Sequence, residues 1–292
     1  MSLCPVCGSV MWPGYEEWHY VCPVCKYEQA TLQPVINDSR AHQLIDESRR
    51  EAGLKSLRVA NFRRLLARIK NFRGGGQLLE VGSAYGWFLD QAQSTFNVVG
   101  VEPDERVFDV ARSRGVPVRR GYFPGILRKE ERYDVIVFND VIEHIPDIVR
   151  VLESCKAHLV RDGILVLNLP SSTGVFYRVA KILFRCGRAA GFHRMWQVGL
   201  PSPHLHYFNE RNLTELLKRN GFDVRERGRL SALRLSGLLT RITYTGESHL
   251  LTRVVLWAIL ALALPLLRVL PSDIMYVIAS SRADGRGGDG VG

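Results

Sequence analysis

Four cysteines near the N-terminus have the spacing of a metal site. Cys4, Cys7, Cys22 and Cys25 form two Cys-x2-Cys pairs that are separated by fourteen residues. Each pair predicts a tight turn, and two such turns can bring four thiolates into the tetrahedral coordination that Zn²⁺ prefers. A unit this short cannot bury enough apolar surface to fold without a staple. We therefore expect a zinc ribbon with a structural Zn²⁺ over residues 1–38.

The surroundings of these cysteines favour metal over disulfides. No apolar run that could serve as an export signal precedes Cys4, so we expect the reducing conditions of the cytoplasm. A peripheral position at the inner face of the membrane is the alternative. Cys155 and Cys186 are isolated and are predicted to be structural.

A second site is predicted at residues 78–86, LLEVGSAYG, where an apolar stretch runs into small residues. Such a turn lets backbone N–H groups approach a ligand closely. Glu102 follows the next apolar stretch, where its carboxylate can accept both ribose hydroxyls of a nucleoside cofactor. Nicotinamide dinucleotides favour G-x-G-x-x-G, whereas here Ala84 stands between Gly82 and Gly86. We expect this alanine to be tolerated if its φ stays negative.

Apolar segments and helical segments alternate around this loop. Strands are expected at 77–82, 97–103, 116–121, 133–140, 162–170, 223–230 and 273–281, and helices at 40–72, 87–96, 105–115, 145–160 and 209–222. The pattern predicts an α/β fold with a doubly wound parallel sheet covered on both faces. The expected organisation is a zinc ribbon (1–38), a helical linker (39–75), an α/β domain (76–281) and a disordered tail (282–292).

At this point the chain resembles the class I S-adenosylmethionine-dependent methyltransferases of the methyltransferase-23/11 type. Five segments in the family's order, spread over residues 76–228, carry the resemblance: LLEVGSAYGWFL, VVGVEPDE, YDVIVFNDVIEHIPD, RDGILVLNLP and PSPHLHYFNERNLTELLKRNGF. It implies a Rossmann-like sheet whose last strand, DIMYVIASS, is antiparallel. The family's acidic residue after the third strand has no match here, so adenine contacts are expected from the backbone around Gly121 and Tyr122.

The resemblance also implies site residues. The cofactor-binding positions are Glu80, Gly82, Ser83, Ala84, Tyr85, Gly86, Glu102, Pro103, Gly121, Tyr122, Asn139, Asp140, Val141 and His144. The sulfonium methyl is already activated, so positioning can dominate catalysis, but a hydroxyl acceptor needs its proton removed. His204 and His206 are the predicted bases, with a structural role open for His204. No carboxylate cluster for a catalytic metal is recognised in the sequence.

These features predict O-methylation of a small molecule, sugar or lipid-linked glycan. Two alternatives stay open: an RNA methyltransferase that uses the ribbon for recognition, and a non-catalytic binding module. The net charge is +10, yet residues 1–38 are acidic, while 39–73 and 171–194 are basic. An acidic ribbon does not favour RNA, and the basic runs are either solvated faces or surfaces for phosphates or lipid headgroups.

An apolar insertion is expected at 248–271. Its uninterrupted part, 254–267, would span about 21 Å as a helix, short of the roughly 30 Å hydrocarbon core. It is either a buried hairpin, a dimer contact, or a patch at the membrane interface beside the basic, aromatic segment 175–196. The oligomeric state is not predicted.

Overall fold

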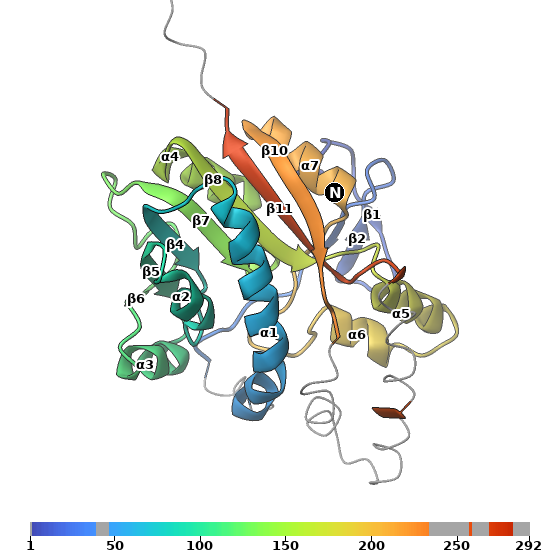
Figure 1. The fold of residues 1–292 in the computed structure, drawn as a ribbon. Helices are drawn as coiled ribbons and strands as arrows, with labels where there is room; N and C mark the ends of the chain where they lie inside the picture. Colours follow the sequence, from blue (N-terminus) through green and yellow to red (C-terminus); the bar gives the residue numbers. More distant parts are fainter. Residues whose placement is uncertain (1, 39–46, 234–256, 259–268, 283–292) are drawn as a thin grey trace, which may run out of the picture.

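A seven-stranded sheet forms the centre of the protein, whose computed structural model describes residues 2–38, 47–233, 257–258 and 269–282 (Figure 1). The strand order is β10-β11-β8-β7-β4-β5-β6. The strands are β4 (Gln77–Val81), β5 (Asn97–Glu102), β6 (Val118–Arg120), β7 (Tyr133–Asn139), β8 (Leu159–Pro170), β10 (Phe222–Leu230) and β11 (Ile274–Ser281). Strand β11 runs antiparallel to both of its neighbours, while β4 to β8 pair in parallel. The predicted fold class is confirmed.

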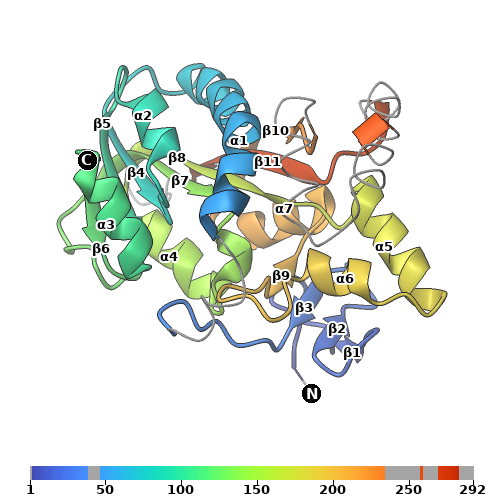
Figure 2. The same ribbon diagram turned by 90° about the horizontal axis from the view of Figure 1, so that it is seen from below.

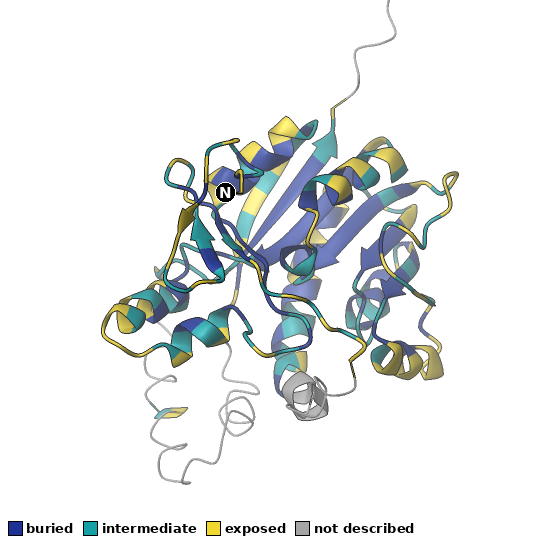
Figure 3. Cartoon of the chain, turned by 180° about the vertical axis from the view of Figure 1, so that it is seen from behind, coloured by how far each residue is buried: buried dark blue, intermediate teal, exposed yellow. Residues whose placement is uncertain are grey.

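Helices cover both faces of this sheet, which explains why its central strands are buried along almost their whole length (Figure 3). On one face, α1 (Glu47–Lys70), α2 (Trp87–Ala92) and α3 (Glu105–Ser113) contribute to a single apolar cluster. On the other face, α4 (Ile148–His158) and α7 (Glu210–Arg219) pack into a second cluster, which also contains Cys4, Cys22 and Tyr27. The N-terminal part that contains the four cysteines, residues 2–30, is called the cysteine unit below. It therefore shares a core with the α/β sheet.

The cysteine unit also shares a sheet with the rest of the chain. Its strands β1 (Trp12–Pro13), β2 (His19–Val21) and β3 (Glu28–Ala30) form an antiparallel sheet whose fourth strand is β9 (His206–Tyr207). Glu28 pairs with Tyr207, and Gln29 pairs with His206. Because β9 lies in the segment before α7, the unit is built into the fold. The predicted domain boundaries stay predictions.

A buried polar network joins the cysteine unit to α5 (Val175–Arg185). His19 lies 2.9 Å from Glu28, whose carboxylate also accepts hydrogen bonds from Tyr177 at 2.7 Å and Lys181 at 2.8 Å. Burial alone would raise the pKa of Glu28, but the hydrogen bonds and charges of His19 and Lys181 hold it below its usual value. Aromatic side chains of α5 and α6 (Ala190–Met195) pack around this network.

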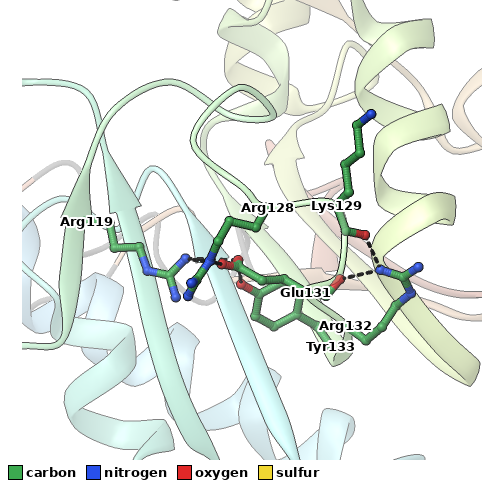
Figure 4. A network of polar contacts seen from close by, with 6 residues as sticks. All are labelled: Arg119, Arg128, Lys129, Glu131, Arg132 and Tyr133. Carbon is green, nitrogen blue, oxygen red and sulfur yellow. Dashed lines mark hydrogen bonds and ion pairs between the residues drawn. The ribbon is translucent and has the colours of Figure 1, made fainter.

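At the other end of the sheet, ion pairs hold the edge strand β6 (Figure 4). The carboxylate of Glu131 accepts hydrogen bonds from Arg119, Arg128 and Tyr133 at 2.7–2.9 Å. Although partial burial would raise it, these partners lower the pKa of Glu131 to about 2. A charged edge of this kind resists pairing with strands of other molecules.

Most of the predicted apolar insertion lies outside the described residues. Of residues 248–271, only 257–258 and 269–271 belong to the described part of the chain. Among the helices that the structure describes, none combines the length and apolar character needed to cross a bilayer.

Candidate functional site

A cavity of about 620 Å³ lies beyond the carboxyl ends of β4, β5 and β7, where parallel α/β sheets bind their ligands. Twelve of the predicted cofactor residues line it: Glu80, Gly82, Ser83, Ala84, Tyr85, Glu102, Pro103, Tyr122, Asn139, Asp140, Val141 and His144. Gly86 and Gly121 do not line it. Gly86 begins α2 with a positive φ of 76° and packs against Val116, so its role there is conformational.

The loop after β4 differs from the expectation at one residue. Gly82 has a φ of 67°, and Ala84 has a φ of 45°. The condition of a negative φ at Ala84 is therefore not met. An L-residue in the left-handed region costs about 1–2 kcal/mol, so the methyl group is tolerated at a cost in strain. In this conformation Ala84 N donates a hydrogen bond of 2.9 Å to Glu102 Oε2.

Glu102 fixes the geometry of two loops at once. Its second oxygen, Oε1, accepts a hydrogen bond of 2.9 Å from Asp104 N, and Asp104 in turn caps α3. The carboxylate is buried at the end of β5 but still borders the cavity. Bonds between a carboxylate and backbone N–H groups are the strong, charge-assisted kind. Glu102 therefore has the position expected of a ribose ligand.

Glu80 places a buried carboxyl group at the cavity. Its Oε1 accepts a hydrogen bond of 2.8 Å from Asn139, and Asn139 is held by Asn168 at 3.3 Å. Its Oε2 is buried and has no hydrogen-bond partner in the described residues. Burial raises the pKa of Glu80 to about 8. An oxygen left in this state fits the ammonium group of S-adenosylmethionine, which would satisfy it.

The two predicted bases lie behind the cavity wall. His206 is buried and uses both ring nitrogens, one toward the Tyr27 hydroxyl and one toward Ile145 O at 2.8 Å. Burial lowers its pKa to about 4. These contacts favour a structural role for His206, whose function as a base stays a prediction. His204 lies 2.8 Å from Gln197 Nε2, and its ring centroid is 4.7 Å from that of His144.

A cluster that the sequence analysis did not recognise forms around His144. Glu143, in the short 3-10 helix η2 (Ile142–His144), is fully buried, and neither carboxylate oxygen has a hydrogen-bond partner within the described chain. One potential ligand atom each from Glu143, His144 and His204 lies within 4.8 Å of the other two. Burial, with a contribution from the charge of Asp140, raises the pKa of Glu143 well above its usual value. Buried groups of this kind mark candidate functional sites.

Two further segments contribute to the cavity wall. The first comprises Gln33, Pro34 and Ile36, directly after β3; the second comprises residues between 197 and 202, which lead into the PSPHLHYF segment. Helix α1 adds Arg58, which lies 3.9 Å from Asp140, and the ring of Phe62. Of the pair Glu143 and His144, the sequence analysis identified His144; the signal for Glu143 was an acid inside an otherwise apolar stretch.

The four N-terminal cysteines converge as their spacing predicts. The sulfur atoms of Cys4 and Cys25 are 3.5 Å apart, those of Cys7 and Cys22 are 3.4 Å apart, and all four lie within 4.8 Å of one another. Tetrahedral zinc with bonds of about 2.3 Å would separate its sulfur ligands by somewhat less than 4 Å. The donor set and its dimensions therefore fit Zn²⁺.

The sheet order, the antiparallel β11 and the cavity beyond β4 and β5 define a class I methyltransferase fold. The methyltransferase domain family matches residues 51–227, more than half of the chain, and the chain belongs to this family of S-adenosylmethionine-dependent enzymes.

Solved structures agree on the fold. A S-adenosylmethionine-dependent methyltransferase of Thermotoga maritima has a TM-score of 0.53 at 18% identity, covering 82% of this chain and 96% of that one. A complex between the Trm112 methyltransferase activator of Haloferax volcanii and a methyltransferase gives a TM-score of 0.57 at 11% identity, with 85% and 100% covered. At these identities the likeness concerns the fold alone.

Curated relatives match a shorter stretch. The ubiquinone biosynthesis O-methyltransferase of Actinobacillus pleuropneumoniae is 28% identical over 111 residues, 34% of this chain and 47% of the relative. The enzyme of the same name from Paramagnetospirillum magneticum is 34% identical over 98 residues, 32% of this chain and 39% of the relative. The chain thus spans half or less of the length of these relatives.

The loop after β4 yields a paired prediction. Ala84→Gly should raise the free energy of unfolding by about 1 kcal/mol, because glycine adopts a positive φ without strain, and should change cofactor affinity by less than about tenfold. Gly82→Val should abolish cofactor binding, since even a Cβ there would lie 2.5 Å from Val141. Urea unfolding and calorimetric titration measure the two effects. A Gly82→Val protein that is folded and binds normally would refute the assignment of the loop.

Proposed function

We propose that this protein transfers the methyl group of S-adenosylmethionine to an oxygen atom of a small molecule, a sugar or a lipid-linked glycan. The observation that carries the proposal is the pair of buried carboxylates at one cavity, Glu80 with an unsatisfied oxygen and Glu102 at the end of β5. The names of the curated relatives, which are O-methyltransferases, support oxygen as the acceptor atom.

In this mechanism the residues of the chain bind and orient the cofactor and shield the reacting groups from water. Glu102 would hold the ribose hydroxyls, and Glu80 would pair with the ammonium group of the cofactor. S-adenosylmethionine supplies an activated methyl group when bound. The wall formed by Trp87 and Phe62 excludes water, and His144, which lines the cavity, can reach an acceptor hydroxyl more directly than the buried His204.

RNA as the acceptor receives less support. Several arginines of the basic run at 39–73 already have protein partners: Arg63 bonds Gln91, Arg68 forms two hydrogen bonds with Glu226, and Arg73 bonds the carbonyls of 161 and 162. Guanidinium groups engaged in this way are less available for phosphates. The cysteine unit uses β3 to pair with β9, so its surface is partly consumed by the fold.

Cofactor binding and label transfer test the proposal. Calorimetry with S-adenosylmethionine should detect binding that falls at least about a hundredfold in Glu102→Ala, because removal of a buried, charge-assisted ligand costs about 3 kcal/mol. Glu105→Ala, an exposed acid at the start of α3, is the matched control.

Incubation with methyl-labelled cofactor and fractionated cell extract then identifies the acceptor class. Label in lipid, polysaccharide or small-molecule fractions supports the proposal, and label in RNA supports the alternative. Cofactor binding without any transfer would indicate the non-catalytic binding module.

We also propose that Glu143, His144 and His204 hold a divalent cation at the edge of the cavity, which His144 alone of the three lines. A mixed carboxylate and imidazole set suits transition metals such as Mn²⁺ or Zn²⁺ better than Mg²⁺. Such an ion would lower the pKa of an acceptor hydroxyl bound next to His144, and it would give the carboxylate of Glu143 the partner that it lacks among the described residues. His204 would then act as a ligand rather than as a base.

Mn²⁺ binding tests this cation. We expect Glu143→Gln to weaken Mn²⁺ binding at least about tenfold, because it removes the only charged ligand of the set. Paramagnetic resonance of free Mn²⁺ measures the affinity, and the exposed Glu153→Gln on α4 serves as the control. Thiolates are poor Mn²⁺ ligands, so the cysteine cluster does not obscure the result. Equal affinities in the wild type and Glu143→Gln would contradict the assignment.

We further propose that the four cysteines bind a structural Zn²⁺. Separately, we propose that α5 contacts membrane lipid. The exposed side of α5 combines Val179, Ile182 and Leu183 with Arg178 and Arg185. Apolar side chains flanked by arginines are typical of helices that lie in the interface of an anionic bilayer. This helix forms the first half of the predicted membrane segment 175–196, and an acceptor carried on lipid would then lie close to the cavity.

Liposome flotation tests the membrane contact. The double variant Ile182→Glu with Leu183→Glu should bind vesicles containing phosphatidylglycerol at least about tenfold more weakly, because it removes apolar surface and adds repulsive charge. Val110→Glu, an exposed apolar residue on α3, is the control. Unchanged flotation of the double variant would exclude α5 as the contact.

A further inference from the structure

The segment that follows the cysteine unit crosses the cofactor cavity. Residues 31–38 leave β3 without regular secondary structure, turn at 36–37 and run toward α3 (Figure 2). Gln33, Pro34 and Ile36 face the cavity and form part of its wall. No motif of the methyltransferase domain covers this segment, since the family match begins at residue 51. The wall is thus supplied from outside the matched domain.

The segment is held at its start and along its middle. Ala30 N donates to Leu205 O at 2.9 Å, and Thr31 N donates to Trp18 O at 2.9 Å, so the start belongs to the cysteine unit and its shared sheet. Farther on, Val35 N donates to Pro201 O at 2.7 Å. This bond joins the segment to another part of the cavity wall, residues 197–202.

The side chain of Asn37 contributes to holding the far end. Asn37 Nδ2 donates to Pro103 O and to the Tyr122 hydroxyl, both at 3.2 Å, and Asn37 Oδ1 accepts from Glu105 N at 3.4 Å. Pro103 follows the ribose ligand Glu102, and Tyr122 lies in the loop after β6, where the adenine is expected. The exposed amide of Asn37 therefore connects the two loops that flank the adenosine end of the cavity.

We propose that residues 31–38 are a strap that closes over the adenosine end of the cofactor cavity, that Asn37 is its latch, and that its release sets the rate at which spent cofactor leaves. The proposal rests on the cofactor assignment of the preceding section. Three long hydrogen bonds from an exposed amide are individually weak, so the latch can open far more easily than the rest of the fold. The start of the strap stays fixed by β3, and the latch end moves. Segments of this kind often limit product release.

Asn37 is a positioning residue, since it acts through the strap and the two loops, and its loss should change rates rather than stability. We expect Asn37→Ala to speed dissociation of S-adenosylhomocysteine about fivefold, with an association rate within about twofold of the wild type. Stopped-flow fluorescence measures both rates, because Trp87 lines the cavity. The melting temperature should change by less than about 2 °C, given the exposure of the side chain.

A mutant cycle isolates the latch. Tyr122→Phe removes one of the three bonds and should speed dissociation about twofold, and the double variant should be no faster than Asn37→Ala alone. Asn71→Ala, an exposed asparagine just past the end of α1, is the matched control and should leave both rates unchanged.

The outcomes separate the strap from the proposed function. If the wild type binds S-adenosylhomocysteine, and this ligand dissociates from Asn37→Ala at the wild-type rate, the strap is refuted while the cofactor assignment stands. If Asn37→Ala and Tyr122→Phe act additively, the latch between these two groups is refuted. If the folded wild type does not bind the nucleoside at all, the cofactor assignment fails, and the strap fails with it.

Discussion

The carboxylate of Glu102 is the interaction on which the site depends. It stands at the end of a buried parallel strand and binds two backbone amides, one from the loop after β4 and one from the start of α3. Ala84, which donates one of these bonds, has a left-handed conformation that its side chain disfavours. The other bond holds Asp104, the residue that caps α3. Glu102 thus anchors two loops that line the cavity, and both loops would lose this common hydrogen-bond acceptor without it.

Three parts of the chain that are distant in sequence complete the wall of the cavity. Helix α1 contributes Arg58 and Phe62, the segment before β9 contributes residues 197–202, and the strap contributes Gln33, Pro34 and Ile36. The pairing of β3 with β9 links two of these parts in one small sheet. It also holds the strand that follows His204, so the cysteine unit supports the same corner of the site in which Glu143 and His144 lie.

Much of this arrangement could be predicted from the sequence, for physical reasons that differ between elements. Runs such as Tyr133–Asn139 are apolar on both faces, which only a covered parallel sheet explains, and their order defined the fold. Glu102 was predictable because an acid directly after such a run reaches the ligand edge of the sheet. The cysteine cluster was predictable because two short turns with thiolates serve few other purposes.

The remaining features depend on contacts that leave no pattern in the sequence. Strands β3 and β9 have three and two residues, too few for a periodicity, and their pairing is a tertiary event. The positive φ of Ala84 runs against the residue's own preference and accompanies its bond to Glu102. Glu143 was missed because its significance lies in the partners it lacks, which only the packed structure reveals.

The shared sheet has a consequence for how such a protein can change over time. A metal-binding unit attached by a linker could be gained, lost or exchanged between chains as a cassette. Here β9 pairs with β3 of the unit. In addition, Tyr27 hydrogen-bonds to His206, and Glu28 accepts a hydrogen bond from Tyr177. Removal would expose an unpaired strand and leave buried polar groups without partners, so inheritance should have kept the two parts together and constrained them to vary jointly.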